Sequence, residues 1–471
     1  MTERTNAPIT VAVVGHTNAG KTSLLRTLTR HIAFGEVSDR PGTTRHVEVI
    51  DLKVDGHAAV RFFDTPGLED AVTLADYMKA LADCPTPPDR VRAFLQGPEA
   101  QRAFEQEAKV LRKMLDVEAG IYVIDTREPV LPKFRAEIEI LTWCAKPIMP
   151  VLNFVRDART RKDEWLATLA AYNLHAHVQF DAVAPFVGSE KLLYQDMATL
   201  LRERRAELSR VVEDLEFQRR ERQAAGARIV AELLVSMAAL RRVIAQEDFE
   251  QPHRRDKFVR DFRQAVLRAS RTAIDDLLAV YGFRPEDADA AVLPWLDGRW
   301  EDDLFNPETL RDASRKLGAG AAVGAAIGLT ADIALAGLSL GAGTALGAAI
   351  GGIASQGWGH LGRRLANKLR GMQELTLENE VLFVLAAQMC ALLRALELRG
   401  HAAQGKIAAG GDAHVEKGEE IRQLVSTLQP ARSHPEWAPV EGRRATNDGA
   451  RMRLVADVSE QLRNQIQTSS N

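Results

Sequence analysis

Cysteine is scarce in this 471-residue sequence. Its three cysteines, Cys84, Cys144 and Cys390, lie far apart and form no Cys-x-x-Cys pair, so neither a disulfide framework nor a zinc site is indicated. A reducing cytosol fits this usage best. The N-terminal stretch MTERTNAPITVAVVGHTNAG also lacks a charged segment followed by a long apolar run and a cleavage site, which predicts that the chain is not exported.

An excess of charge of one sign is absent as well. Lys and Arg number 61, Asp and Glu number 64, and the formal net charge is -3 at pH 7. Proteins that bind RNA or DNA usually carry a broad basic surface. Nucleic acid is therefore not the expected partner.

The pattern of apolar residues changes near Arg205. After a flexible N-terminus at 1–8, residues 9–205 alternate short apolar runs with amphipathic helices, which predicts an α/β P-loop domain with a mostly parallel, doubly wound sheet. Beyond Arg205 we expect the strands to stop and helices to continue. We expect an α-helical domain over 206–400, then loose helices and a partly disordered tail over 401–471.

The stretch Val11–Leu25 joins an apolar run, a glycine-containing turn and a helix, and it contains the pattern GxxxxGK[ST] of a phosphate-binding loop. Gly15 and Gly20 let backbone N–H groups approach an anion, and the helix N-terminus faces it. Lys21 is expected to reach the β- and γ-phosphates, and the Thr22 hydroxyl to bind Mg²⁺. The predicted nucleotide-binding residues of this loop are Gly15, His16, Thr17, Asn18, Ala19, Gly20, Lys21, Thr22 and Ser23.

A turn-rich polar segment, 39–46, follows the P-loop helix at the distance expected of a mobile switch. A hydroxyl in such a loop can complete the Mg²⁺ shell while the γ-phosphate is present. We predict that Thr44 does so, with Thr43 close to the nucleotide. Taken alone, the segment also fits an ordinary polar turn.

Two alternating runs, 47–54 and 58–63, are joined by Asp55-Gly56 and predict a β-hairpin. The second run ends in DTPG. A carboxylate at the end of this strand can hold Mg²⁺ through water, and the N–H of Gly67 can bond the γ-phosphate and sense its loss. The predicted metal ligands are therefore Thr22, Thr44 and Asp64, and the predicted nucleotide contacts include Asp64, Thr65, Pro66 and Gly67.

Leu68 stands where Ras-like enzymes carry the glutamine that orients the attacking water, and a leucine side chain cannot do this. Residues 70–115 then exceed the length of a simple switch helix and contain the breaker cluster 84–88. We interpret 70–115 as an inserted helical elaboration of the second switch. Its role stays open between an effector or dimer surface and a surface insertion without a special role.

Base contacts are expected from loops that follow the later strands, at 119–125, 147–153 and 177–180, with a helix over 134–145 between the first two. The usual Asn-Lys-x-Asp is altered to NFVRD, with Asn153 in place and Asp157 one position late. This pattern favours guanine over adenine. The predicted base-binding residues are Asn153, Asp157, Asp181 and Ala182.

Together, GHTNAGKTS, PGTTR and DTPG resemble the motifs of bacterial GTPases of the Era/TrmE type, the Era–EngA–TrmE–YfjP group. The resemblance covers about residues 9–205 and implies GTP binding and slow, Mg²⁺-dependent hydrolysis to GDP and phosphate. Members of the group commonly have an apolar residue after DxxG, and several use K⁺ held by the P-loop asparagine and pair their G domains. Carried over, the resemblance implies K⁺ at Asn18, a G-domain homodimer, and catalytic roles for Lys21, Thr44, Gly67 and Asn18.

The segment 317–356 is rich in Gly and Ala and contains one ionisable residue, Asp332. Glycines recur every four residues in each half, which favours two closely packed helices with a turn near 332–339. Each half is near the length of a bilayer span, and flanking basic residues would place both ends on the cytoplasmic side. Inner-membrane contact and a buried soluble hairpin both stay open, and a further apolar helix is expected over 375–398.

The sequence thus predicts a GTP-driven switch whose nucleotide state controls a helical effector domain. We expect it in the cytoplasm, or associated with the cytoplasmic side of the inner membrane. Two other functions stay open: a soluble GTPase that assembles ribosomes or acts on RNA, and an oligomeric signalling protein in which the nucleotide only gates partner binding.

Overall fold

The computed structural model describes residues 7–29, 47–81, 84–181, 188–283, 304–305, 338–340, 371–398, 418–439 and 445–468. The chain divides into two compact units: the main part of the first is Met1–Arg219, and the second begins at Arg220. The division falls within helix α8 (Arg205–Ala239), which begins at the predicted domain boundary. Each unit has its own apolar core.

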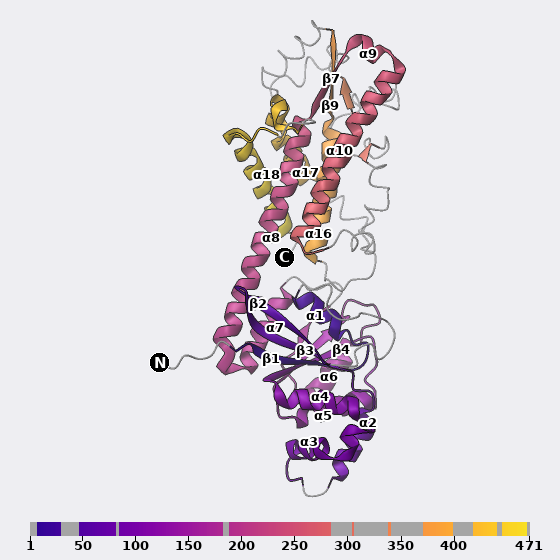
Figure 1. Cartoon of the computed structure of the whole chain (residues 1–471), viewed down its shortest axis with the longest axis vertical. Coiled ribbons are helices and arrows are strands. Elements are labelled where there is room, and N and C mark those ends of the chain that lie inside the picture. Colours follow the sequence, from indigo (N-terminus) through magenta and orange to yellow (C-terminus); the bar gives the residue numbers. More distant parts are fainter. Residues whose placement is uncertain are drawn as a thin grey trace. The chain divides into compact units, whose positions relative to one another are not determined.

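The first unit is built on a six-stranded sheet in the order β2-β3-β1-β4-β5-β6 (Figure 1). All neighbouring strands are parallel except β2 and β3. The predicted mostly parallel α/β sheet is therefore confirmed. Its strands are β1 (Ile9–Val14), β2 (Glu48–Val54), β3 (His57–Asp64), β4 (Ala119–Asp125), β5 (Ile148–Asn153) and β6 (Val178–Gln179).

Helices cover both faces of this sheet because successive strand residues point to opposite sides. Val11 and Val13 of β1 pack with α1, α7 and the first turns of α8, whereas Ala12 and Val14 pack on the other face with α2 to α6. The domain is therefore doubly wound. The covering helices are α1 (Lys21–Thr29), α2 (Ala71–Ala80), α3 (Pro87–Gln96), α4 (Glu105–Asp116), α5 (Pro132–Trp143), α6 (Lys162–Ala171) and α7 (Ser189–Leu200).

The predicted hairpin is present, with β2 antiparallel to β3. Asp55 and Gly56 have φ of 51° and 79°, the positive values that a two-residue turn needs if it is to match the twist of the strands. The turn brings β3 back beside β1. Asp64, the last residue of β3, is thereby placed beside the phosphate loop.

The region predicted as a helical insertion holds α2, α3, a short 3₁₀ turn η1 (Pro98–Gln101) and α4. Three aromatic side chains pack at its centre: the ring of Phe94 lies 6.2 Å from that of Tyr77 and 6.1 Å from that of Phe104. These helices are continuous with the core that covers one face of the sheet. The insertion is thus part of the folded domain.

The second unit is mostly helical, but it also contains strands, so the expectation that strands stop after Arg205 is wrong. Strands β7 (Arg241–Ala245), β9 (Met372–Leu377) and β8 (Leu338–Leu340) form an antiparallel sheet in the order β7-β9-β8. These segments are far apart in the sequence, and local periodicity cannot show that they pair. The helices and 3₁₀ turns from Arg202 onward are η2 (Arg202–Arg204), α8, α9 (Gln246–Glu250), α10 (Pro252–Val280), α16 (Asn379–Leu398), α17 (Gly418–Thr427), η4 (Gln429–Ser433), η5 (Pro435–Trp437) and α18 (Gly449–Thr468).

Two further expectations for this region need correction. The helix predicted over 375–398 begins at Asn379, because the residues up to Leu377 belong to β9. The C-terminal helices predicted to be loose instead contribute buried side chains to the core of the second unit, among them Leu424 of α17 and Val458 and Leu462 of α18. Their apolar residues at helical spacing find partners there that the sequence alone does not reveal.

The Gly/Ala-rich segment 317–356 lies outside the described residues except for β8. Leu338 and Ser339, placed by prediction in the turn of a helical hairpin, belong to this strand. Among the described residues, one helix is long and apolar enough to cross a membrane by length and composition, Asn379–Glu397, with a mean hydropathy of 1.5. In the second unit 72% of it is buried, as in the core helix of a soluble domain.

A buried ion pair ties β7 to β9. Arg241 and Glu374 lie 3.1 Å apart, and their side chains are 8% and 4% exposed. We expect Glu374→Ala to lower the free energy of unfolding of the second unit by about 3–5 kcal/mol, because it removes a carboxylate that pairs with a buried guanidinium. Denaturant unfolding of the full chain measures this change.

The double variant Arg241→Met/Glu374→Leu is the matched control for that loss. Replacing a whole buried ion pair by apolar side chains of similar volume is often neutral or stabilising, so the double variant should regain most of the lost stability. A double variant as unstable as Glu374→Ala would contradict an electrostatic origin.

Glu378, between β9 and α16, gives the second unit a pH dependence. Burial and the neighbouring Glu380 raise the pKa of Glu378 to about 7, against a lowering effect of Arg432. The Glu378 carboxyl group therefore binds its proton more tightly in the folded protein than in the unfolded chain. We expect the free energy of unfolding to fall by about 1–2 kcal/mol as the pH rises from about 4.5 to about 7, allowing for partial exposure.

Denaturant unfolding at pH 5 and pH 8 measures this difference. Glu378→Gln should remove the part of the pH dependence that Glu378 causes, since the glutamine does not titrate. An unchanged slope in Glu378→Gln would show that another group is responsible.

Candidate nucleotide-binding site

The phosphate loop follows β1 and has the backbone that its glycines permit. Gly15 and Gly20 have φ of 146° and 95°, values that side chains rarely adopt. A Cβ at Gly15 would lie 2.4 Å from the carbonyl oxygen of Val123 in β4, and one at Gly20 would lie 2.3 Å from Nδ2 of Asn153. The loop therefore packs directly on β4 and on the loop after β5.

Lys21 begins α1, and its side chain is buried. Its Nζ donates to the carbonyl oxygens of Gly15 and His16, at 3.1 and 2.9 Å. Burial lowers the pKa of Lys21, while the nearby carboxylates of Asp64 and Glu137 act in the opposite direction. The ammonium is thus held within the loop, where an arriving phosphate can replace the carbonyl oxygens as its partner.

Thr22 and Asp64 meet beside the loop. The Thr22 hydroxyl donates to Oδ2 of Asp64 at 2.6 Å, while Oδ1 of Asp64 is buried and has no hydrogen-bond partner among the described residues. Burial raises the pKa of Asp64 to about 6, although Thr22 and Lys21 lower it. A buried carboxylate oxygen without a partner, next to a hydroxyl, fits a Mg²⁺ ion, which prefers oxygen ligands and often keeps its waters.

The rest of the DTPG motif has two structural contacts. The Thr65 hydroxyl donates to the carbonyl oxygen of Val13 at 2.8 Å, which ties the end of β3 to β1, and its nucleotide contact stays a prediction. Pro66 is buried. A Cβ on Gly67 would lie 2.3 Å from Oγ1 and 2.7 Å from N of Thr17, so the backbone at Gly67 passes close against the phosphate loop. Leu68 is fully buried in the core beside α2, as expected of a residue that cannot orient water.

His16 has partners on two other elements that the sequence did not indicate. Its Nδ1 lies 2.8 Å from Oε1 of Glu137 on α5 and 3.1 Å from the carbonyl oxygen of Leu68, and its Nε2 lies 2.9 Å from Nζ of Lys133. Glu137 is fully buried and also accepts from the Tyr122 hydroxyl at 2.9 Å. Glu137 is one of several charged residues in α5, so no sequence signal singled it out.

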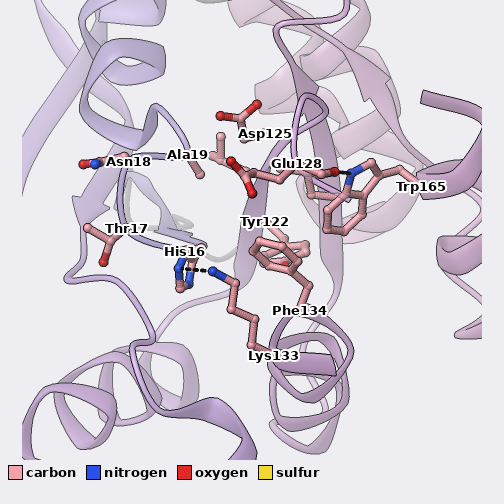
Figure 2. Close-up of a pocket in the computed structure, with 12 residues that line it drawn as sticks. His16, Thr17, Asn18, Ala19, Tyr122, Asp125, Glu128, Lys133, Phe134 and Trp165 are labelled. Atoms are coloured by element: carbon pink, nitrogen blue, oxygen red, sulfur yellow. Dashed lines mark hydrogen bonds between the residues drawn. The ribbon is translucent and has the colours of Figure 1, made fainter. Parts of the chain in front are cut away.

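A pocket of about 220 Å³ lies beside the loop (Figure 2). Figure 2 shows the Lys133 side chain directed at His16, and the Trp165 indole N–H donating to the backbone carbonyl oxygen of Glu128. Its lining residues are His16, Thr17, Asn18, Ala19, Tyr122, Val123, Ile124, Asp125, Glu128, Lys133, Phe134 and Trp165. Four residues of the predicted loop thus line a cavity that residues of α5 also line.

Asn153, the one intact residue of the altered base motif, ties two loops together. Its Nδ2 donates to the carbonyl oxygen of Ala19 at 3.0 Å, and its Oδ1 accepts from the Phe154 N–H at 3.0 Å. Phe154 has φ of 60°, and its ring lies 3.7 Å from the guanidinium of Arg127. The phosphate loop and the predicted base loop are therefore held at a fixed spacing.

Asp157 already has a partner. Arg159 donates to both of its carboxylate oxygens, from Nε at 3.0 Å and from Nη2 at 2.9 Å, and these bonds hold the pKa of Asp157 well below its usual range. Guanine offers a similar pair of parallel N–H donors, so its binding to Asp157 requires Arg159 to move. Asp181 is buried at the end of the last strand, and Ser23 lies on α1.

Three predicted site residues, Thr43, Thr44 and Ala182, lie outside the described residues. The structure brings Asp64, Gly67 and Asn153 together around the phosphate loop. Residues that the prediction missed are Tyr122, Lys133 and Glu137 beneath the loop and Arg127 and Arg159 beside the base motif.

Comparison with known protein families gives two matches. Residues 10–154 match the family described as 50S ribosome-binding GTPase, so the N-terminal domain is a P-loop GTPase domain. Residues 167–460, more than half of the chain, match the family described as a domain of unknown function, DUF3482. The specific Era/TrmE group is not distinguished by these matches.

Among curated proteins, the chain is similar to the probable GTP-binding protein EngB of Neisseria gonorrhoeae, 40% identical over 167 residues. That similarity spans 35% of this chain and 66% of the relative. Among solved structures, Era of Aquifex aeolicus bound to GDP.AlF4- is 19% identical, with a TM-score of 0.28 over 37% of this chain and 50% of that one.

Another solved structure is Era in complex with MgGDPNP and nucleotides 1506–1542 of 16S ribosomal RNA, 18% identical, with a TM-score of 0.28 over 37% of this chain and 50% of that one. Our expectation that nucleic acid is not a partner stays a prediction. The extent of the longer family match nevertheless decides the assignment: the chain belongs to the DUF3482 family and carries a GTPase domain at its N-terminus.

Proposed function

We propose that this chain is a Mg²⁺-dependent enzyme that hydrolyses GTP to GDP and phosphate. The observation that carries the proposal is the meeting of Lys21, Thr22 and Asp64 at the ends of β1 and β3, with Oδ1 of Asp64 buried and unpaired among the described residues. A bound Mg²⁺ neutralises phosphate charge. Lys21 binds the β- and γ-phosphates, Thr22 and Asp64 hold the ion, and Gly67 contacts the γ-phosphate.

Guanine is the proposed base. Asn153 holds the base loop against the phosphate loop through Ala19, and the Asp157 carboxylate accepts two parallel N–H donors, as it does from Arg159. Asp181 and Ala182 complete the proposed base pocket. The 40% identity to a relative named as a GTP-binding protein supports the same base.

The test compares GTP with ATP on the full chain. We expect phosphate release from GTP in Mg²⁺, and competition by GDP but not ADP for a fluorescent guanine nucleotide. Arg159→Ala is the matched variant, and it should tighten GDP binding slightly because it frees Asp157. Equal affinity for GDP and ADP would overturn the guanine assignment and leave the phosphate site standing.

The monovalent ion and the dimer belong to the same proposal. Asn18 holds K⁺ where two G domains pair. This ion takes the role of the glutamine of Ras-like enzymes, whose position is occupied by Leu68 in this chain. Hydrolysis should then be faster in K⁺ than in Na⁺ and rise with protein concentration. Turnover that is the same in both salts and independent of concentration would contradict this part.

In this proposal the nucleotide state controls the helical unit. The segment 317–356 then contacts the cytoplasmic side of the inner membrane. A carbonate wash of fractionated cells tests this, and protein that is fully soluble after lysis contradicts the membrane part. The family description 50S ribosome-binding GTPase supports a second candidate, a cytoplasmic role in ribosome assembly. Co-sedimentation with 50S subunits that depends on GTP would favour it.

A further inference from the structure

One peptide group in the second switch is held from both sides. The carbonyl oxygen of Leu68 lies 3.1 Å from Nδ1 of His16 in the phosphate loop. The N–H of the same peptide group belongs to Glu69 and donates to Oε1 of Glu107 on α4 at 3.1 Å. This peptide group is one residue beyond Gly67, the residue that contacts the γ-phosphate in the proposed function.

The chemistry of the contacts fixes the roles of the His16 nitrogens. A carbonyl oxygen and a carboxylate are both acceptors, so Nδ1 of His16 carries a proton, which it shares between the Leu68 carbonyl oxygen at 3.1 Å and Oε1 of Glu137 at 2.8 Å. Nε2 then accepts from the Lys133 ammonium at 2.9 Å. The ring is further held by Glu137, which is fully buried, and by an edge contact to Phe134 with ring centroids 5.2 Å apart.

Glu107, in the inserted helices, holds the N–H side of the same peptide group. Its side chain is 4% exposed, and Oε1 accepts both the Glu69 N–H at 3.1 Å and the Asp70 N–H at 3.0 Å. Asp70 in turn caps α2 by accepting from the Thr73 N–H at 3.3 Å. The start of α2 is therefore oriented by a carboxylate that belongs to α4.

We propose that His16 and Glu107 are positioning residues for GTP hydrolysis, which together clamp the Leu68–Glu69 peptide group. This inference rests on the proposed function. The Leu68–Glu69 peptide group is two peptide groups beyond the one that carries the Gly67 N–H, so the clamp restrains the backbone that follows Gly67 and limits how far this N–H can turn. It also connects the phosphate loop to α2 and α4, which gives the insertion a role in reporting the nucleotide state.

The kinetic test uses variants that separate the two His16 nitrogens. Asn places its amide nitrogen at the position of Nδ1, whereas Gln places its amide near Nε2. His16→Asn should therefore keep kcat within about threefold of the wild-type value. His16→Gln should lower kcat by about 10- to 100-fold, because a small misplacement at a reacting centre slows the reaction by about that factor. The affinity of His16→Gln for GDP should change little.

Glu107→Gln and Glu107→Ala make the same comparison on the other side. The Gln carbonyl oxygen still accepts two N–H groups, so kcat should be largely retained, while Glu107→Ala should resemble His16→Gln. Lys79→Ala is the matched control, because the Lys79–Glu139 contact, 2.8 Å, joins α2 to α5 at the surface without touching the clamp. It should leave kcat unchanged.

Amide hydrogen exchange at Glu69 and Asp70 tests the clamp without nucleotide. Exchange at Glu69 should be slow in the wild type and faster in both His16→Gln and Glu107→Ala. If His16→Gln left this exchange and kcat unchanged, the clamp would be overturned. If no variant, including the wild type, hydrolysed GTP, the proposed function would fail, while the exchange result would still decide whether the clamp exists.

Discussion

Replacing Lys21 by alanine is expected to lower GTP hydrolysis by about 100- to 1000-fold, the usual loss when one donor to a developing charge is removed. Lys21 is the buried ammonium of the phosphate loop, and two carbonyl oxygens hold it there at 2.9 and 3.1 Å. Because a phosphate binds an ammonium more strongly than a neutral carbonyl does, the nucleotide takes over this cation. The alanine variant has no ammonium group in the phosphate loop. Phosphate release and binding of a fluorescent GTP analogue measure the loss.

A folding defect must be separated from a binding defect in this variant. Lys21→Met keeps the apolar stem and should lose activity to the same extent, while circular dichroism and unfolding remain close to the wild type. Lys53→Ala, at an exposed position of β2, should have no effect on either. Normal hydrolysis by Lys21→Ala would contradict the assignment of this loop as the phosphate site.

Replacing Asp64 by asparagine is expected to change stability and metal-dependent binding in opposite directions. Burial raises the pKa of Asp64 to about 6, so the ionised form that prevails at pH 8 is unfavourable in the nucleotide-free protein. Removing this charge should raise the free energy of unfolding by about 1–3 kcal/mol. The same change removes the charge that holds Mg²⁺ through water, and the gain in GTP affinity on adding Mg²⁺ should shrink by about 10- to 100-fold.

Thermal unfolding without nucleotide and GTP titrations in Mg²⁺ or EDTA measure the two effects. The opposite signs exclude a general loss of structure as the cause. Thr22→Ser, which keeps the hydroxyl that donates to Asp64, should bind Mg²⁺ with GTP normally, and Thr22→Val should not. An Asp64→Asn protein that kept the full Mg²⁺ effect would overturn the metal site.

Local sequence patterns indicated which residues lie near one another at the phosphate side of the site. The two glycines of the loop, Lys21, Thr22 and Asp64 all depend on short-range rules about turns, strand ends and helix starts, and the structure brings them together. Thr65 shows the limit of such rules, because they did not predict that its hydroxyl bonds the neighbouring strand at Val13.

Contacts between elements distant in sequence were out of reach. Glu137 lies on a helix more than a hundred residues after His16, and nothing local connects them. The small sheet of the second unit could not be predicted for the same reason, because its strands are far apart in the sequence. Glu374 and Thr376 of β9 are buried, as are Leu375 and Leu377, although this alternation of polar and apolar residues is typical of a strand with one exposed face. Glu374 pairs across the two strands with Arg241 of β7.

Helix α8 determines where this chain can be cut. Its first turns place Leu208, Val211 and Leu215 in the core of the GTPase domain, and its last turns belong to the core of the second unit. A fragment that stops at Arg205, where the sequence pattern changes, would lose these three side chains and expose the apolar surface that they cover. Separate expression of the GTPase domain therefore has to retain the helix to Arg219.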